Sequence, residues 1–145
     1  MNVPLHVKAA IVCDDIRQEQ NGKLLAIGIY AGDILLDSFP ASLILNWLLL
    51  AELTSENDTV SQLEVRIAFN QDTDQPQIAM GKVEFQSTPH GSRDLLIKLP
   101  NVGLQFTKAT DLILSVKEGD EWREVSRMQI RLKEPTVSSI APSQP

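Results

Sequence analysis

The sequence predicts an all-β fold, namely a single-domain antiparallel β-sandwich of the Ig-like or C2-like type with about eight strands. Apolar and polar residues alternate along residues 62–69 and again along residues 127–133, which is typical of strands that bury one face. Clusters of Asn, Asp, Gly, Pro and Thr separate these runs at short, regular intervals. No stretch requires a helix, and 145 residues are enough for one hydrophobic core. We therefore expect one domain over residues 1–134 and a flexible Pro- and Ser-rich tail over residues 135–145.

The first expected element is a hairpin that turns at Asn21 and Gly22, because both residues accept the positive φ values of a two-residue type I′ turn. The register that follows from such a turn places Gln20 opposite Lys23. One face of the hairpin would then carry apolar residues and the other a solvated polar stripe. The apolar face would hold Ile16, Leu25, Ile27 and Ile29, and the polar face Asp15, Arg17 and Glu19.

Asp14 does not fit this pattern, since the same register places it beside Ile29 on the apolar face. Either a bulge rotates Asp14 outward, or its carboxylate is buried and held by hydrogen bonds. We expect a structural role in which the carboxylates here accept backbone N–H bonds or meet an arginine. Cys13 is expected to be packed and not activated, because neighbouring carboxylates raise the pKa of a thiol. The residues with expected structural roles are Asp14, Asp15, Arg17, Asn21 and Gly22.

Residues 42–53 form the most apolar run and are compatible with a strand or a buried helix, because a run that is apolar on both faces carries no periodic signal. The all-β context favours a strand. Its outward residues would then form an apolar patch that a protein partner or a second copy would cover. In the alternative interpretation, the strand is central and is covered by the connection over residues 31–42. The predicted interaction surface consists of Ile44, Leu48, Leu50 and Leu96, and the predicted inward residues are Leu43, Leu45, Trp47 and Leu49.

The second half of the chain continues with short strands. We expect strands within residues 77–87 and 94–106, where apolar residues are bounded by turn-forming clusters. Leu112, Leu114 and Val116 alternate in phase, and a Gly-Asp step follows them. This pattern predicts a hairpin that leads into the last strand.

The charge and the cysteine content limit the possible partners and the compartment. Nineteen acidic and thirteen basic residues give a net charge of -6, so nucleic acid and anionic membrane surfaces would repel the domain on average. The single cysteine excludes an internal disulfide framework, which suits a reducing compartment. The N-terminal residues do not resemble a secretory signal, and no apolar run is long enough to span a bilayer. We therefore expect a cytoplasmic protein without nucleic-acid or membrane partners.

The N-terminal residues also resemble a known family. The string from Cys13 to Arg17, followed by Glu19, Gly22-Lys23 and the string from Ile27 to Tyr30, is similar to the N-terminal signature of a small bacterial family known only as a domain of unknown function. The similarity is specific over about residues 9–36 and afterwards rests on strand patterning alone. It implies a β-rich domain of this length and no particular activity.

Acidic residues in several turns raise the alternative of a calcium site. Calcium takes several oxygen ligands from adjacent loops, and a C2-like sandwich would supply them. In an up-and-down chain, successive turns alternate between the two ends, which would bring one set of aspartates together. The weak metal candidates are Asp33, Asp37, Asp72 and Asp74, with Asp111 at the same end. Aspartates are common in turns for reasons of backbone geometry alone, and we expect no cofactor.

Nothing in the sequence predicts catalysis. His90, which has serines and an aspartate nearby in a loop, is the only candidate, and residues adjacent in one loop do not make a catalytic triad. No phosphate-binding glycine loop or nucleophile elbow is present. The predicted function is a non-catalytic interaction or scaffold module that binds a protein partner or forms a homodimer through residues 42–53. The alternative is a C2-like calcium-dependent binding domain.

Overall fold

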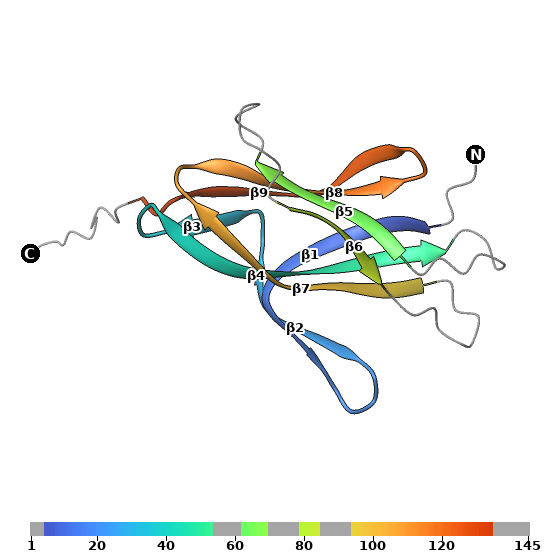
Figure 1. The fold of residues 1–145 in the computed structure, drawn as a ribbon. Helices are drawn as coiled ribbons and strands as arrows, with labels where there is room; N and C mark the ends of the chain where they lie inside the picture. Colours follow the sequence, from blue (N-terminus) through green and yellow to red (C-terminus); the bar gives the residue numbers. More distant parts are fainter. Residues whose placement is uncertain (1–4, 54–61, 70–78, 85–93, 135–145) are drawn as a thin grey trace, which may run out of the picture.

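The chain folds into strands that are arranged in two sheets, as the all-β prediction requires (Figure 1). The computed structural model describes residues 5–53, 62–69, 79–84 and 94–134, and these residues contain nine strands and no helix. The strands are β1 (Leu5–Gln18), β2 (Leu24–Tyr30), β3 (Asp33–Leu36), β4 (Ala41–Leu53), β5 (Gln62–Phe69), β6 (Ala79–Glu84), β7 (Asp94–Phe106), β8 (Thr110–Glu118) and β9 (Glu121–Leu132). The predicted tail over residues 135–145 lies outside the described residues.

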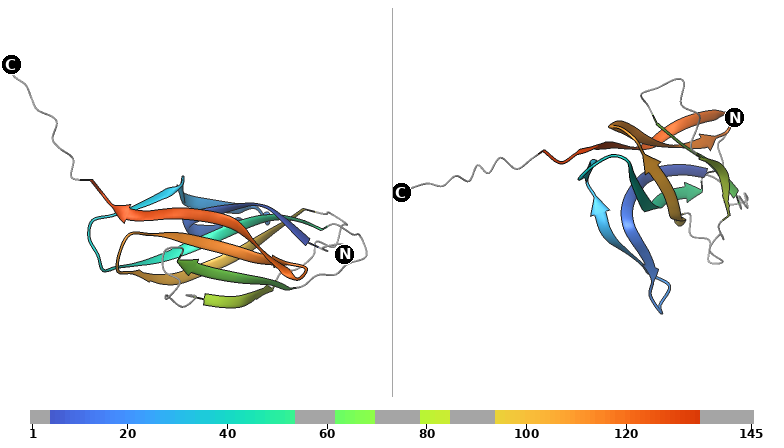
Figure 2. Two further views of the ribbon diagram at one scale, coloured as in Figure 1. Left: turned by 90° about the horizontal axis from the view of Figure 1, so that it is seen from above. Right: turned by 60° about the vertical axis from the view of Figure 1, so that its left-hand side comes forward.

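The two sheets are layered face to face, as the views of Figures 1 and 2 show. Sheet A has the order β2-β1-β4-β7, and sheet B has the order β3-β9-β8-β5-β6. All pairs are antiparallel except β3 with β9. The chain crosses repeatedly between the sheets, so the up-and-down topology assumed for the calcium prediction is wrong. The physical reason is that the central strands pair with strands that do not follow them in the chain. β4 pairs with β1 and β7, and β8 pairs with β5.

The core lies between the sheets and draws on alternate residues of both. Residues 42–53 belong to strand β4, so the preference for a strand over a helix is confirmed. Trp47 is a core residue with 1% of its surface exposed. At one end of the core, the rings of Phe106 in sheet A and Phe69 in sheet B meet with their centroids 5.5 Å apart. The most deeply buried side chains are Trp47, Phe106, Leu45, Leu49, Ile97, Leu112, Leu114, Ile130, Val7, Val116 and Cys13.

A partly buried ion pair links the β8–β9 hairpin of sheet B to β1 of sheet A. The hairpin itself forms where the Gly-Asp step predicted it, with Glu118 opposite Glu121. The guanidinium of Arg123 lies 2.5 Å from Glu118 Oε1, and it also donates to the carbonyl of Val7. The N–H of Val7 donates to the same carboxylate at 3.2 Å. Burial alone would raise the pKa of Glu118, but the hydrogen bonds from Arg123 and Val7, together with the positive charges of Arg123 and His6, lower it.

Replacing Glu118 with glutamine is expected to lower the free energy of unfolding by roughly 1–2 kcal/mol at neutral pH, because the charge-assisted bonds are lost and Arg123 is still partly solvated. The folded-state pKa of Glu118 is below its ordinary value of 4.5, so its stabilisation is present above that value and is lost as the pH falls through the folded-state pKa. Denaturant unfolding at several pH values should therefore show a difference that shrinks as the pH falls below 4.5. Glu121→Gln is the control. A pH-independent difference for Glu118→Gln would contradict the prediction.

Candidate interaction surface

The predicted hairpin forms between β1 and β2, but its register differs from the prediction by one residue. Gly22 N–H donates to the Glu19 carbonyl at 3.0 Å, and Glu19 N–H donates to the Lys23 carbonyl at 2.8 Å. The loop therefore has three residues, with Gly22 at a φ of 85°, and it is not the two-residue turn that was predicted. Asn21 lies in the turn but does not have the predicted positive φ; instead its side-chain oxygen accepts the N–H of Lys23 at 3.1 Å.

This register places the apolar residues of β2 on the same face as the polar residues of β1. Asp15 pairs with Ile27 and Arg17 with Leu25, so the prediction of separate apolar and polar faces is wrong. Leu25, Ile27 and Ile29 are exposed, and Ile29 has 58% of its surface accessible. In Figures 1 and 2 this hairpin projects away from the two layers, so sheet B does not cover it. We call Leu25, Ile27 and Ile29 the β2 strip.

Asp14 and Asp15 have structural contacts, as expected for these carboxylates. Asp15 Oδ2 lies 3.0 Å from Nε of Arg17. The exposed Asp14 accepts the hydroxyl of Tyr30 at 2.5 Å. β1 and β2 pair here without a register shift, so no bulge rotates Asp14. The Asp14 carboxylate lies over Gly28, which has a φ of 71°. A Cβ added at Gly28 would be 2.4 Å from Asp14 Oδ2. Burial, followed by the hydrogen bond to Asp14 and the charge of that carboxylate, raises the pKa of Tyr30 to about 12.

Asn46 joins this N-terminal segment to β7, a role that the sequence did not suggest. Its Nδ2 donates to the carbonyl of Asp14 and its Oδ1 accepts the N–H of Asn101, both at 2.8 Å. Asn101 has a φ of 55° and lies at the register shift between β4 and β7. Cys13, which pairs with Asn46, is fully buried, and burial together with the nearby carboxylates raises the pKa of its thiol. A polar residue within an apolar run was the only available signal for Asn46.

The predicted patch on β4 and β7 is only partly exposed. Ile44 and Leu96 have 64% and 51% of their surfaces accessible, and Leu50, which pairs with Leu96, is half-buried. The prediction that Leu48 lies exposed is wrong, because only 7% of its surface is accessible. Leu48 occupies the central strand β4 and has Ile11 and Lys98 as neighbours on either side. The connection over residues 31–42 is not its cover, since β3 within it belongs to sheet B.

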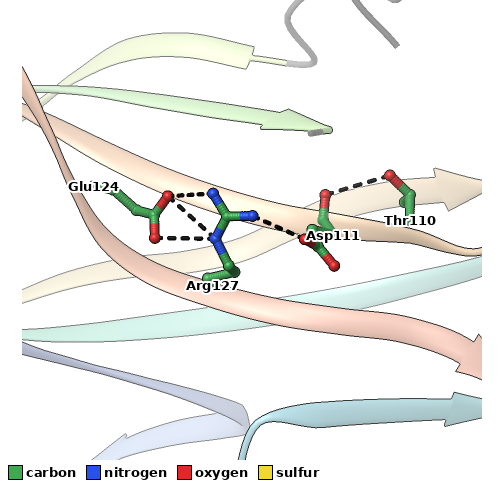
Figure 3. A network of polar contacts seen from close by, with 4 residues as sticks. All are labelled: Thr110, Asp111, Glu124 and Arg127. Atoms are coloured by element: carbon green, nitrogen blue, oxygen red, sulfur yellow. Dashed lines mark hydrogen bonds and ion pairs between the residues drawn. The ribbon is translucent and has the colours of Figure 1, made fainter. Parts of the chain in front are cut away.

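The outer faces of the two sheets differ in character. Of the seven exposed large apolar side chains among the described residues, the β2 strip, Ile44 and Leu96 belong to sheet A. Sheet B holds the other two, Leu35 and Leu132. Ion pairs occur on both sheets: Asp15 with Arg17 on sheet A, and on sheet B Arg127, which lies 2.6 Å from Glu124 and 2.8 Å from Asp111 (Figure 3). The hydrogen bond from Arg127 lowers the pKa of Glu124. The outer face of sheet A is therefore the candidate interaction surface.

The metal candidates that the structure describes do not converge. Asp33 lies 2.6 Å from Arg131, and Asp37 lies 3.6 Å from Lys133. Asp72 and Asp74 are outside the described residues, as is His90. Within the described ranges, no group of three or more His, Cys, Asp or Glu side chains is placed to hold a metal ion.

Calcium binding is testable by thermal unfolding. We expect the midpoint to agree within about 1 °C in millimolar calcium and in chelator, since Asp33 and Asp37 already have basic partners. The C2-like alternative requires a rise of several degrees, because a ligand that binds only the folded state stabilises it. Magnesium is the control for a nonspecific effect of divalent ions. A calcium-specific rise that Asp72→Asn reduces would favour the alternative.

The described part of the molecule defines its class: an all-β domain of two layered sheets, in which sheet A carries five of the seven exposed large apolar side chains. Among these residues there is no helix with the length and apolar character that a membrane crossing needs. The chain matches the model of DUF6941, a family of unknown function, over residues 8–131, and it belongs to this family. The predicted membership in a family of unknown function is thereby confirmed. A search of curated proteins gave no match.

Proposed function

We propose that this protein is a non-catalytic interaction or scaffold module that binds a protein partner through the outer face of sheet A. The observation that carries the proposal is the concentration of exposed aliphatic side chains on that face. Exposed apolar groups that gather on one face of a domain usually mark a contact with another molecule. Sheet B has only two exposed large apolar side chains among the described residues, against five on sheet A, which supports the choice of sheet A.

The surroundings of Cys13 support the non-catalytic part of the proposal. A reactive cysteine needs solvent access and a lowered thiol pKa, whereas Cys13 is buried and its pKa is raised. Asp14 and Asp15 are engaged with Tyr30 and Arg17. The same proposal places the protein in a bacterial cytoplasm, where a single buried cysteine would stay reduced.

The strand order supports an Ig-like sandwich in preference to a C2-like one. In Ig-like domains, strands A, B and E are in one sheet and C, F and G in the other, with C′ beside C in the variable type. Assigning A, B and E to β1, β4 and β7, and C, C′, F and G to β5, β6, β8 and β9, reproduces the observed neighbours. On this assignment β2 is an addition to the sandwich, and additions to a rigid scaffold often carry function.

Site-specific photocrosslinking in cells tests the proposed surface. A photoreactive amino acid is placed at Ile44 or Leu96 on the outer face of sheet A, and at the exposed Gln129 of sheet B as the matched control. We expect discrete adducts of reproducible mass from positions 44 and 96 and none from position 129. Equal adduct patterns at all three positions, or none at any, would overturn the proposal.

A further inference from the structure

Among the described residues, one edge of strand β2 has no neighbouring strand and is suited to pairing with another strand. It is the first strand in the order β2-β1-β4-β7, so only β1 pairs with it among the described residues. Free strand edges present unpaired N–H and C=O groups, which recruit another strand unless something prevents it. The seven residues of β2, LLAIGIY, contain no charge and no proline. Nothing in the sequence of β2 therefore opposes pairing.

The other edge strands carry features that discourage pairing. β7 contains Pro100, and Asn101 beside it has a φ of 55°. β3 has only four residues, and its Asp33 lies in an ion pair with Arg131. The sequence of β6 includes a lysine and a glutamate. Charges, prolines, irregular backbone and short length are the usual means of protecting a sheet edge. β2 has no charge and no proline, and its backbone irregularity is the φ of 71° at Gly28.

The hydrogen bonds of the hairpin show which groups of β2 are free. The pair Glu19–Lys23 is hydrogen-bonded, and hydrogen-bonded and non-hydrogen-bonded pairs alternate along an antiparallel ladder. The odd-numbered residues of β2 therefore direct their backbone groups toward β1. The residues that direct them toward the open edge are Leu24, Ala26, Gly28 and Tyr30.

We propose that a second copy of this chain pairs with this edge, β2 against β2 in antiparallel orientation, about a two-fold axis at Ile27. This proposal rests on the proposed function, since it names one partner of the interaction module. In this register Ala26 is opposite Gly28 of the other copy and Leu24 is opposite Tyr30 of the other copy. In a regular ladder these four residues direct their backbone groups to the shared edge, and the φ of 71° at Gly28 departs from that geometry at the Ala26–Gly28 pairs.

The side chains of β2 also match in this register. Ile27 is opposite its own copy, and Leu25 is opposite Ile29 of the other copy, so the two β2 strips join into one apolar surface. At Gly28 the space that a Cβ would take is occupied by the Asp14 carboxylate of the same copy. The result is a continuous sheet with the four strands of sheet A from each copy.

The charges near β2 are compatible with self-association. Each copy has a net charge of -6, so two copies repel one another on average. β2 itself is uncharged, and the neighbouring Asp15 is paired with Arg17 at 3.0 Å. The Asp14 carboxylate, which lies over Gly28, adds one negative charge beside the contact in each copy.

A charge-swap experiment at Ile27 tests the two-fold register. The unmodified chain is expected to sediment as a dimer, and Ile27→Lys and Ile27→Glu are each expected to weaken self-association roughly 100-fold, because like charges would face one another at the axis. An equal mixture of the two variants should form a heterodimer that weakens as salt is added. Leu35→Lys, at an exposed leucine on edge strand β3, is the matched control and should leave the dimer unchanged.

A disulfide measurement keeps the test independent of charge and of any loss of folding. Ile27→Cys should give a disulfide-linked dimer under mild oxidation, since directly opposite residues in a non-hydrogen-bonded pair are close enough for the bond. Leu35→Cys should not, and the native Cys13 is fully buried. A monomeric unmodified chain, or a dimer that persists in Ile27→Lys without a disulfide in Ile27→Cys, would overturn this inference. If positions 44 and 96 give crosslinks, the proposed function stands whether or not the chain forms this dimer. If they give none and the chain forms an Ile27-dependent dimer, only the proposed location on the outer face of sheet A is overturned.

Discussion

Leu48→Asp is expected to lower the free energy of unfolding by roughly 3–4 kcal/mol, whereas Ile44→Asp should change it by about 1 kcal/mol or less. The two residues lie on the same face of β4, but Leu48 is 7% exposed and Ile44 is 64% exposed. The first substitution loses a buried aliphatic side chain and desolvates a carboxylate between β1 and β7. The second places its carboxylate in water. Denaturant unfolding of the two variants measures the difference directly.

Ile44→Asp is the matched control for Leu48→Asp, because it introduces the same side chain on the same strand. Equal destabilisation by the two variants would mean that Leu48 is as accessible as Ile44, and it would restore the continuous exposed patch that the alternation of β4 predicted. The comparison also matters for any study of self-association. A Leu48 variant that fails to associate would report on folding, whereas Ile44, Leu96 and the β2 strip are exposed and suitable for interface variants.

Phe106→Ala is expected to destabilise the domain by about 3–5 kcal/mol, which is a large fraction of the total stability of a domain of this size. Phe106 has no exposed surface, and its ring meets that of Phe69 across the two sheets. Removing the ring leaves a cavity at the end of the core that the rigid strands cannot fill. The thermal midpoint and the denaturant midpoint should both fall.

Phe69→Ala is expected to cost less, because Phe69 is only half-buried. The double variant should be less destabilised than the sum of the single variants by about 0.5–1.5 kcal/mol, the usual contribution of an aromatic pair. Strictly additive effects would show that the two rings do not interact, and a Phe106→Ala effect below about 1 kcal/mol would contradict its place in the core.

The sites that the sequence predicted correctly are those where a local rule is sufficient. The alternation along residues 62–69 predicts β5 because a strand with one buried face needs a period of two. The turn at Asn21 and Gly22 is found because few residues accept a positive φ. The Gly-Asp step before β9 is a further case. Each of these signals depends on neighbouring residues alone.

The errors arose where a residue's surroundings come from distant parts of the chain. A two-residue and a three-residue loop differ by one position, and this difference exchanged the faces of β1 relative to β2, so that Asp15 lies beside Ile27. Leu48 has the outward phase of its strand and is still buried, because β1 and β7 flank it on both sides. The role of Asn46 depends on Asp14 and Asn101, which are 32 and 55 residues away in the chain.

By itself, the sequence determined the all-β class, most strands and the positions of the turns, because backbone preference and the period of apolar residues are local properties. The tertiary structure alone decided which apolar side chains remain exposed, since burial depends on what other strands contribute on both sides of a residue. It therefore also decided the location of the candidate surface. On sheet A the exposed aliphatic side chains of the described residues are at the edge strand β2 and at Ile44 and Leu96, and Leu48 belongs to the packed centre of this sheet.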